Sequence, residues 1–342
     1  MLRVPQKLKK GDSIGVTATS AGLEDNAGLN KLENAIKNIK AMGFDIIETK
    51  NVRECEKLVS SSGEERAKEF LNLWKNEKVK LIITARGGEF LMEMLPFIDS
   101  EVINKYEPKW VQGFSDTSLL LFYLTTNFNI PTIHANNFSS YGMRDLHESL
   151  TSTIEMLEEC DKPSVQSNFE MYESYSINRE DGKELEPYNL TEKVQYKNLY
   201  NKNTETLRGR LIGGCIDVLK IIAGMPFDNT KNFCEQFDEG MIWYLENCEM
   251  TVCDLYRSLW QMKMAGWFKN AKGFLIGRTR ANSSIGDFTY EDVLHSVFDD
   301  MIVPVIYDVD FGHVMPQLTF VNGGKAEFLY EKGSGKISIE IK

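Results

Sequence analysis

The sequence lacks a hydrophobic run long enough to cross a membrane. A spanning helix takes about 18 or more consecutive apolar residues, and no run in the 342 residues approaches this length. The N-terminal stretch MLRVPQKLKKGDSIGV is basic, but no long apolar stretch follows its charges. It therefore does not fit a secretory signal peptide. We expect a cytoplasmic protein with no membrane partner.

Histidine is scarce, and cysteine shows no metal-binding pattern. The four histidines form no HExxH or other ligand spacing, and the six cysteines form no CxxC pair. Such spacings are typical of zinc sites, so we expect no metal and no other cofactor. In a chain of this length without an export signal, the cysteines are predicted to be reduced thiols.

The chain also lacks an excess of positive charge. Its 39 basic residues are outnumbered by 50 acidic residues, which gives a formal net charge of -11. A broad nucleic-acid surface needs clustered Lys and Arg, so a nucleic-acid partner is not expected. One small pocket for a phosphate or carboxylate remains compatible with this charge. At roughly 150 residues per domain, the length suggests about two domains.

The first half of the chain alternates strand-like and helix-like segments. Strands are predicted at 12–20, 44–50, 80–88, 109–116 and 130–136, and helices at 26–43, 62–76 and 117–128. This alternation indicates a largely parallel sheet covered on both faces. In such a fold the functional groups belong in loops at the carboxyl ends of the strands.

The second half reads differently. Residues 163–206 are polar and rich in Tyr, Asn and Glu, whereas from Leu207 onward ordered strands and helices return and end in Gly-rich antiparallel strands. We predict an α/β fold. Its parts are a Rossmann-like N-terminal domain at 1–165, a linker or substrate loop at 166–206, and a C-terminal α/β domain with a β-rich tail at 207–342.

The stretch GFSDTSLLLFYL places Ser115 between a predicted strand and a predicted helix. Such a serine either caps the helix, a position that Ser and Asp favour, or acts as a nucleophile on a sharp strand-to-helix turn. In the second case the backbone N–H of Asp116 lies where an oxyanion would form. The hydrolase pattern is G-x-S-x-G, and here Thr117 occupies the last position. The stretch alone leaves both roles open.

A nucleophilic serine needs a base, and two histidines lie near predicted strand ends. His313 is in DFGHVMPQLTF beside Gly312, and His134 is in PTIHAN. Each has a structural role as its alternative. His147 and His295 fall in polar helical contexts and are interpreted as surface residues.

An acid that orients the base is the third member of such a triad. Glu246 ends the apolar strand GMIWYLEN, where sites are built, although a solvated strand end is an equally plain explanation. Glu249, Asp254 and Asp308 are weaker candidates.

The segment ARGGEF at 85–90 follows a predicted buried strand. Its two glycines allow the backbone to turn and present N–H groups to an anion. Arg86 carries the charge to bind a carboxylate. The pattern lacks the spacing of a Walker or Rossmann nucleotide loop, so a simple turn is the alternative.

In this order, the segments resemble the LD-carboxypeptidase family of serine peptidases, which includes muramoyl-tetrapeptide carboxypeptidases and microcin C immunity peptidases. The matching segments are GDSIGV, SSGEERA, ARGGEF, GFSDTS, TIHAN, LIGGCIDVL, WYLEN and DFGH. They run through most of the chain, and GFSDT and the late Gly-His are the most specific.

The resemblance implies a role for each candidate residue. Ser115 takes the place of the nucleophile, His313 of the base and Glu246 of the orienting acid. The oxyanion hole would use the N–H groups of Asp116 and Gly88. The triad would then form across a cleft between two domains of a homodimeric, metal-independent enzyme.

Three segments depart from the family pattern. The first strand ends in TATSAG in place of a Pro-Ser pair, Glu89 and Phe90 replace a Tyr-Gly pair, and Cys215 stands where Asn is common. These differences lie outside the triad and bear on substrate recognition.

The length and the segment 163–206 favour the microcin-immunity branch, in which loop aromatics stack on a nucleotide base. The segment has no Trp; its aromatics are Phe169, Tyr172, Tyr175, Tyr188, Tyr196 and Tyr200. We expect a peptidase or amidase that cleaves peptidyl- or aminoacyl-nucleotides through an acyl-enzyme. The alternatives are an LD-carboxypeptidase that trims cell-wall tetrapeptides, a non-catalytic binder of a small anionic ligand, and an α/β-hydrolase esterase.

Overall fold

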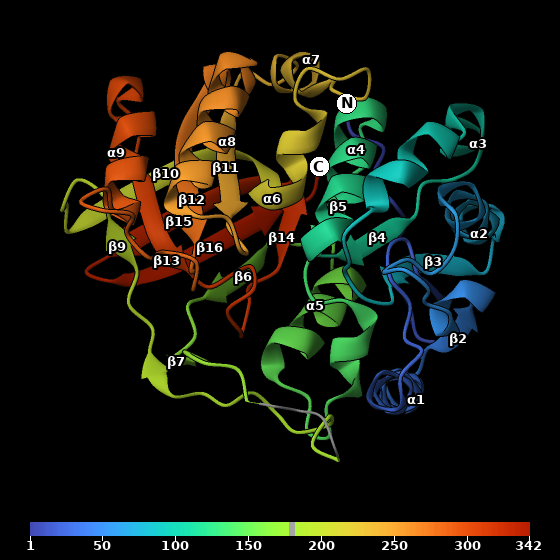
Figure 1. Cartoon of the computed structure of the whole chain (residues 1–342). Helices are drawn as coiled ribbons and strands as arrows, with labels where there is room; N and C mark the ends of the chain where they lie inside the picture. Colours follow the sequence, from blue (N-terminus) through green and yellow to red (C-terminus); the bar gives the residue numbers. More distant parts are fainter. Residues whose placement is uncertain (178–181) are drawn as a thin grey trace.

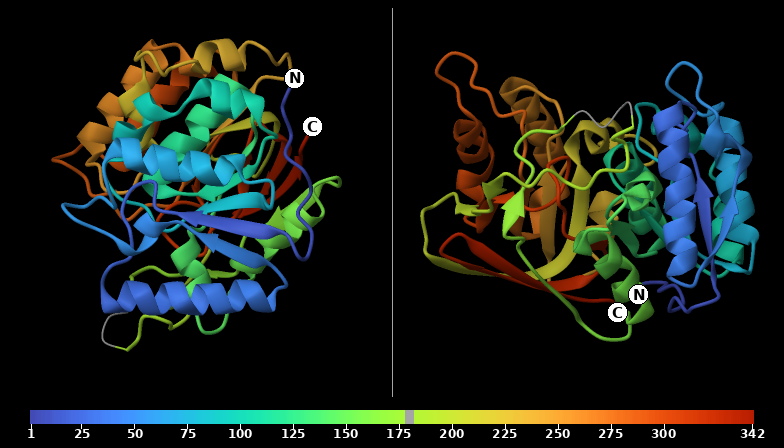
Figure 2. Two further views of the ribbon diagram at one scale, coloured as in Figure 1. Left: turned by 90° about the vertical axis from the view of Figure 1, so that its right-hand side faces the viewer. Right: turned by 90° about the horizontal axis from the view of Figure 1, so that it is seen from below.

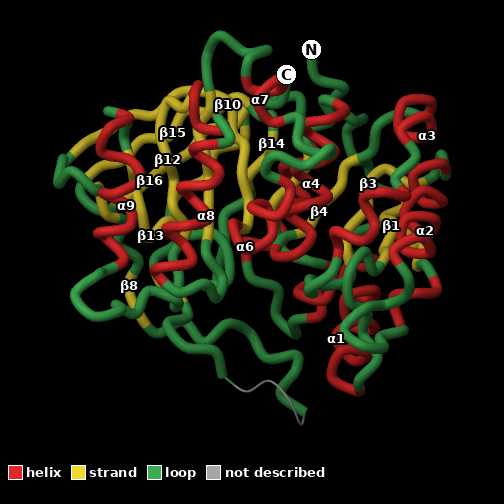
Figure 3. Tube along the Cα trace, turned by 45° about the horizontal axis from the view of Figure 1, so that its top comes forward, coloured by secondary structure: helices red, strands yellow, loops and turns green. Residues whose placement is uncertain are grey.

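Two large β-sheets stand side by side in the computed structural model, which describes residues 1–177 and 182–342 (Figure 1). Helices pack around both sheets, as Figure 3 shows in a second orientation. One sheet is mainly parallel and comes mostly from the N-terminal half, and the other includes the β-rich tail. The predicted mixed α/β fold is therefore confirmed.

The first sheet takes five strands from the N-terminal half and one from near the C-terminus. Its strands are β1 (Ser13–Thr17), β2 (Asp45–Glu48), β3 (Val79–Thr84), β4 (Trp110–Gly113), β5 (Thr132–His134) and β14 (Phe320–Asn322). Their order is β14-β5-β4-β3-β1-β2. Strands β1 to β5 run parallel to one another, whereas β14 pairs antiparallel with β5. Their carboxyl ends therefore meet along one edge, where functional loops gather.

The helices of this half begin and end where local sequence signals place them. They are α1 (Asn26–Ala41), α2 (Gly63–Lys75), α3 (Ser100–Lys105), α4 (Ser118–Phe128) and α5 (Glu148–Glu158). The predicted start of α2 is confirmed, because the Ser62 side chain accepts the N–H of Glu65 as an N-cap. Just beyond α1, Gly43 adopts φ +93°, a left-handed conformation that glycine tolerates well.

The second sheet combines parallel and antiparallel pairing. Its strands are β6 (Ser164–Ser167), β9 (Lys197–Asn198), β10 (Thr204–Cys215), β11 (Met241–Glu246), β12 (Ala271–Gly277), β13 (Val305–Val309), β15 (Lys325–Glu331) and β16 (Ser334–Glu340). Strands β10 to β13 run parallel, and β15, β16 and β6 extend the sheet antiparallel from β10. The carboxyl ends of β10 to β13 form a second edge suited to a site.

The remaining helices are short or lie on the second sheet. The α-helices are α6 (Ile216–Leu219), α7 (Thr230–Cys234), α8 (Val252–Met264) and α9 (Tyr290–Phe298), and α8 and α9 lie over the strands in Figure 3. The 3₁₀ helices are η1 (Lys50–Arg53), η2 (Leu91–Phe97), η3 (Ser115–Thr117), η4 (Phe138–Gly142), η5 (Lys220–Ile222), η6 (Trp267–Asn270) and η7 (Asp299–Met301).

The segment predicted as a linker or substrate loop contributes both edges of the second sheet. Strand β6 pairs with β16 at one edge, and β9 pairs with β13 at the other. Between them, β7 (Met171–Tyr172) and β8 (Glu192–Lys193) form a small antiparallel ribbon. In Figure 1 the described parts of this segment lie along the lower side of the molecule, between the second sheet and α5.

Helix α4 joins the two sheets through the hydrophobic core. Every residue from Ser118 to Phe128 is buried except the half-buried Asn127. Phe122 stacks on Trp267 at a ring-centroid distance of 5.0 Å, and Trp267 stacks on Trp243 of β11 at 5.8 Å. Burying a large aromatic side chain contributes about 1.5–3 kcal/mol, so this aromatic stack helps to hold α4 against β11.

The two termini lie next to each other in both views of Figure 2. Within residues 1–177 and 182–342, no helix combines the length and the apolar character that a membrane span requires.

Candidate active site

Ser115 occupies a strained turn between β4 and α4. Its φ is +62°, a left-handed conformation that costs a non-glycine residue about 1–3 kcal/mol. Gly113 makes the turn possible, because a Cβ atom at this position would lie 2.5 Å from Thr84 Oγ1. The Asn137 carboxamide oxygen accepts the Phe114 N–H at 3.1 Å and the Thr84 hydroxyl at 2.8 Å. The surrounding hydrogen bonds thus hold Ser115 in a conformation it would otherwise leave.

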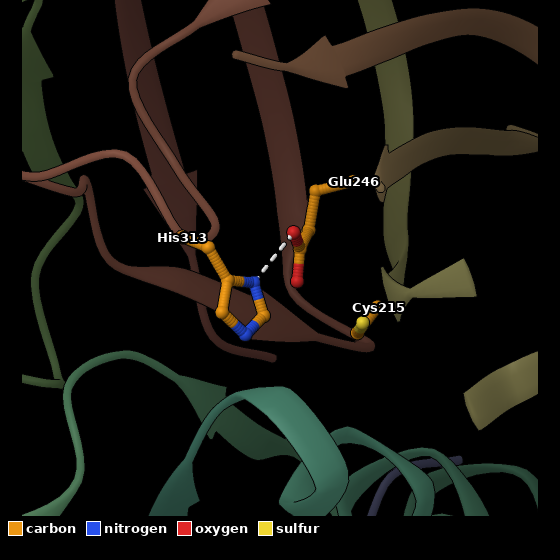
Figure 4. A group of neighbouring side chains, drawn as sticks. All are labelled: Cys215, Glu246 and His313. Carbon is orange, nitrogen blue, oxygen red and sulfur yellow. Dashed lines mark hydrogen bonds and ion pairs between the residues drawn. The ribbon is translucent and has the colours of Figure 1, made fainter. Parts of the chain in front are cut away.

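Three residues from distant parts of the chain form one line of hydrogen bonds. Ser115 Oγ lies 2.9 Å from His313 Nε2, and His313 Nδ1 lies 2.9 Å from Glu246 Oε2. Figure 4 shows His313 and Glu246 joined in this way. The side chain of Glu246 is fully buried and that of His313 is 25% exposed. The structure therefore brings together all three residues that the sequence analysis selected as a triad.

Two glycines create the space that Glu246 occupies at the end of β11. A Cβ atom at Gly312 would lie 2.7 Å from Glu246 Oε2, and one at Gly277 would lie 2.8 Å from Glu246 Cβ. Gly312 also has φ +96°, which disfavours any side chain. The glycine of the DFGH segment is therefore needed twice, for its conformation and for its lack of a side chain.

The Glu246 carboxylate and the His313 imidazole shift each other's pKa in opposite directions. Burial alone would raise the pKa of Glu246, but the charge and hydrogen bond of His313 outweigh burial and hold it below its ordinary value. Burial alone would lower the pKa of His313, but Glu246 and the Cys248 thiol hold it well above its ordinary value. The pair is therefore stable as a carboxylate beside a protonated imidazole.

The Asp116 carboxylate ties two neighbouring loops to the Ser115 turn. Asp116 Oδ2 accepts the Ser20 hydroxyl at 2.5 Å and the Leu91 N–H at 2.9 Å. Burial raises the pKa of this carboxyl, and the bonds from Ser20 and Leu91 oppose the rise. Ser20 belongs to TATSAG, the segment that departs from the family pattern. The carboxylate of Asp116 thus holds the loops around the site, while its N–H follows Ser115 directly.

The glycines of the ARGGEF loop pack against the same turn. A Cβ atom at Gly87 would lie 3.0 Å from Ser115 Oγ, and one at Gly88 would lie 2.3 Å from Ser20 Oγ. Gly87 is thus the glycine in closest approach to Ser115. Arg86 is exposed and makes no hydrogen bond or ion pair with the described part of the chain. The loop therefore carries an exposed guanidinium group that has no ion-pair partner in the described chain.

The rival base, His134, is buried in an aromatic cluster. Its ring meets those of Tyr244, Phe114 and Phe311 at centroid distances of 5.4, 6.4 and 6.4 Å. Neither ring nitrogen has a hydrogen-bond partner within residues 1–177 and 182–342. Burial lowers the pKa of His134 to about 4. His313, and not His134, is the histidine that meets Ser115.

The other histidines and the rival acids have local structural contacts. His147 caps α5, and the His295 side chain lies 2.9 Å from Asp299. Both were interpreted as surface residues, but the His147 ring is half-buried between Phe169 and Tyr188. Among the rival acids, Asp254 bonds the Thr251 cap of α8, Asp308 pairs with Lys197, and Glu249 is exposed.

The structure adds positioning residues that the sequence analysis did not single out. Asn137 follows the matched TIHAN segment by one residue, so extending that match by one position would have included it. Arg278 forms a buried ion pair with Asp310, the first residue of DFGH, at 2.7 Å. This pair anchors the loop that carries His313.

Most aromatics of the 163–206 segment pack within the fold. Tyr196 is buried and donates its hydroxyl to Asp310 Oδ2 at 2.9 Å. Tyr172 lies over the Arg278 guanidinium at 4.0 Å. Tyr188 donates its hydroxyl to Asn136 at 3.3 Å. Tyr175 is 59% exposed and remains accessible to a ligand.

Together the side chains make acyl transfer chemically possible. His313 Nε2 can accept the Ser115 proton, while Glu246 holds the imidazole by its Nδ1–H and stabilises the charge that forms. The strained turn presents Oγ near the N-terminus of α4, whose partial positive charge favours a developing oxyanion.

Comparison with known proteins shows the same family along most of the chain. Residues 14–135 match the LD-carboxypeptidase N-terminal domain, and residues 208–328 match the LD-carboxypeptidase C-terminal domain. The microcin C7 self-immunity protein MccF of Escherichia coli is 26% identical over 331 residues, covering 93% of this chain and 90% of that protein. A probable murein peptide carboxypeptidase of Bacillus subtilis is 24% identical, covering 94% and 90%.

Solved structures agree with this assignment. An MccF-like protein from Bacillus anthracis superposes with a TM-score of 0.83 at 25% identity and covers 99% of both chains. MccF in complex with glutamyl sulfamoyl guanosine superposes with a TM-score of 0.84 at 24% identity, covering 99% of this chain and 98% of that one. Since both halves match and the fold extends over the whole length, the chain belongs to the LD-carboxypeptidase family of peptidases.

Proposed function

We propose that the protein is a serine-type peptidase or amidase with Ser115 as nucleophile, His313 as base and Glu246 as orienting acid. The observation that carries the proposal is the continuous line of two 2.9 Å contacts from Ser115 Oγ through His313 to Glu246. A helix-capping serine needs no such line. Here Ser115 makes no side-chain cap of η3 or α4.

In this mechanism His313 takes the hydroxyl proton as Ser115 attacks the carbonyl carbon. The oxyanion is stabilised by backbone N–H groups, for which we propose those of Asp116 and of Gly88 in the ARGG loop. The close packing of Gly87 against Ser115 makes Gly87 the competing choice. The protonated imidazole then passes its proton to the leaving group, and water releases the acyl group.

For the substrate we propose a peptidyl- or aminoacyl-nucleotide. MccF structures were solved with glutamyl sulfamoyl guanosine and with aspartyl sulfamoyl adenosine. The unpaired Arg86 and the exposed Tyr175 are the groups we assign to an anionic and an aromatic part of such a ligand. We further propose that the protein is a homodimer, as the family resemblance implies, and that it acts in the cytoplasm.

The alternative substrate is a cell-wall tetrapeptide. It is favoured by the similarity to the probable murein peptide carboxypeptidase of Bacillus subtilis. Assaying both substrate classes with one preparation separates the two, because turnover of one class alone identifies the branch.

The catalytic proposal is tested with a fluorophosphonate probe and peptide mapping of the labelled site. We expect covalent labelling of Ser115 in the wild-type protein and none in Ser115→Ala or His313→Ala. The Ser115→Ala variant should lose at least ~10⁴-fold in kcat and keep its fold. Ser118→Ala is the matched control, because Ser118 is three residues away and its hydroxyl oxygen accepts only the Cys215 N–H within the described part of the chain. Unlabelled, folded wild-type protein would favour a non-catalytic binder.

A further inference from the structure

A buried thiol lies beside the Glu246–His313 pair. Cys215 is the last residue of β10 and Glu246 is the last residue of β11, and the parallel register places them directly opposite each other. Cys215 is only 2% exposed. Cys215 stands where Asn is common in the family pattern. The thiol is therefore a feature of this chain, set next to the pair by strand register.

Three different donor atoms converge at this point. A Cys215 sulfur, a Glu246 carboxylate oxygen and a His313 ring nitrogen all lie within 4.8 Å of one another. Figure 4 shows Cys215 and His313 on either side of the Glu246 carboxylate. Glu246 Oε1 is completely buried, and the neighbouring Cys215 thiol is a donor that helps to stabilise the carboxylate. Because S–H is a weak donor, a cation at this point would stabilise the carboxylate better than the thiol does.

We propose that Cys215, Glu246 and His313 form an inhibitory binding site for Zn²⁺. Sulfur, nitrogen and carboxylate oxygen are the donors that zinc takes in proteins, at about 2.0–2.3 Å from the ion. In a tetrahedral site these distances separate the donors by about 3.5 Å. The donors lie within 4.8 Å of one another, so binding the ion requires them to approach by up to about 1.3 Å, and a water molecule would take the fourth position.

Zinc and catalysis exclude each other at His313. In the catalytically competent triad the imidazole is neutral, its Nδ1–H donates to Glu246, and Nε2 is free to accept the Ser115 proton. If zinc binds Nδ1, the neutral ring carries its proton on Nε2, which then donates to Ser115 and no longer acts as a base. The Cys215 thiol gives one proton to solvent when it binds zinc, so the ion binds more tightly as the pH rises.

Cys215 and Glu246 are held opposite each other by the pairing of β10 with β11, so the fold does not depend on the ion. Zinc is therefore a reversible inhibitor and not a permanent part of the fold. The ligands come from three separate segments, which explains why no sequence spacing predicted a metal site.

Binding is tested without any activity measurement, in the Ser115→Ala variant, with Co²⁺ as a spectroscopic substitute for Zn²⁺. We expect a thiolate-to-cobalt charge-transfer band at a stoichiometry of one ion per chain, removed by Zn²⁺ and unaffected by Mg²⁺, which prefers oxygen ligands. Cys215→Ser should weaken binding by at least ~100-fold, since loss of even an outer-shell partner costs 10–100-fold. Cys55→Ser is the matched control and should bind like its parent.

The absence of the band, or a band that persists in both Cys215→Ser and Cys215→Ala, overturns the site. Because this result does not involve turnover, it stays separate from any failure of the proposed peptidase activity, on which the inhibitory role rests. In the wild-type enzyme, Zn²⁺ should inhibit, and a chelator should restore the rate in full. Activity that requires Zn²⁺ would contradict an inhibitory site. For Cys215→Ser, the Zn²⁺ concentration for half-inhibition, relative to its own zinc-free rate, should rise at least ~100-fold.

Discussion

The Arg278 guanidinium donates to the Asp310 carboxylate at 2.7 Å, and both side chains are almost completely buried. Asp310 also accepts the Tyr196 hydroxyl and the Phe169 N–H. Three residues later in the same loop comes His313. A charge pair that water does not reach thus fixes the chain that carries the proposed base.

Asp310→Asn is therefore expected to destabilise the protein by about 3–5 kcal/mol, because it leaves the Arg278 charge buried without its partner. Denaturant unfolding followed by circular dichroism measures this change. Asp308→Asn is the matched control: Asp308 forms a half-exposed pair with Lys197, and Asn tolerates its φ of +59°. The control should lose no more than about 1 kcal/mol, and equal losses in the two variants would contradict the argument.

Activity is expected to fall as the pH drops through the raised pKa of His313. The imidazole must be neutral to accept the Ser115 proton, and Glu246 and Cys248 hold its pKa above the ordinary value of 6.5. The acidic limb of the profile of kcat/KM against pH should therefore lie above pH 6.5.

Glu246→Gln removes the main cause of that shift. Its acidic limb should move to lower pH, while kcat falls by about 10³–10⁴-fold because the imidazole loses its orienting partner. An acidic limb that stays in place in this variant would show that another group controls it.

Gly312→Ala adds only one methyl group, but it is expected to disrupt the proposed site strongly. The new Cβ atom would meet Glu246 Oε2 at 2.7 Å, so the contact between Glu246 and His313 must break or the loop must shift. We expect kcat to drop at least ~100-fold, because misplacement of a catalytic group by about 1 Å has this effect.

The matched control for this change is Gly286→Ala. Gly286 also has a positive φ, +63°, but a Cβ atom there would meet no atom within 4 Å. A non-glycine residue at a positive φ costs about 1–2 kcal/mol, so both variants carry some conformational strain, and only Gly312→Ala should lose activity. Loss of activity in both would assign the effect to backbone strain alone.

The two histidines that the sequence left as rival bases are expected to respond differently to substitution. His313→Ala should reduce kcat by at least ~10⁴-fold. His134→Phe should keep kcat within ~10-fold, because the His134 ring is neutral, packs among aromatic rings and bonds nothing in the described chain. Steady-state kinetics of both variants, after circular dichroism has verified their folding, decides between them.

The local parts of the fold were predictable because their signals are short-range. Alternating strands and helices gave the parallel sheet, and Ser62 marked the start of α2 through its cap. The turn at Ser115 was recognisable from Gly113 and the apolar helix that follows. Its catalytic interpretation depended on finding the other family-like segments in the same order along the chain.

The long-range parts were not predictable from these signals. Tyr196 lies in a polar stretch, yet its ring stacks on Phe328 and its hydroxyl bonds Asp310. No sequence feature near Asp116 predicts that its carboxylate accepts the Ser20 hydroxyl, because Ser20 lies almost a hundred residues earlier. Such contacts depend on how the chain crosses itself, which periodicity and capping do not encode.

Strand β14 sits at the edge of the first sheet, although it is made from residues 320–322. During translation β1 to β5 therefore leave the ribosome long before β14 has been made. Until then, the edge of β5 that pairs with β14 has unpaired backbone N–H and C=O groups. The first sheet cannot be completed until residues 320–322 have been synthesised. Premature termination anywhere before β14 would leave the edge of β5 exposed, and an exposed strand edge favours aggregation. Truncated chains that lack β14 are therefore expected to aggregate.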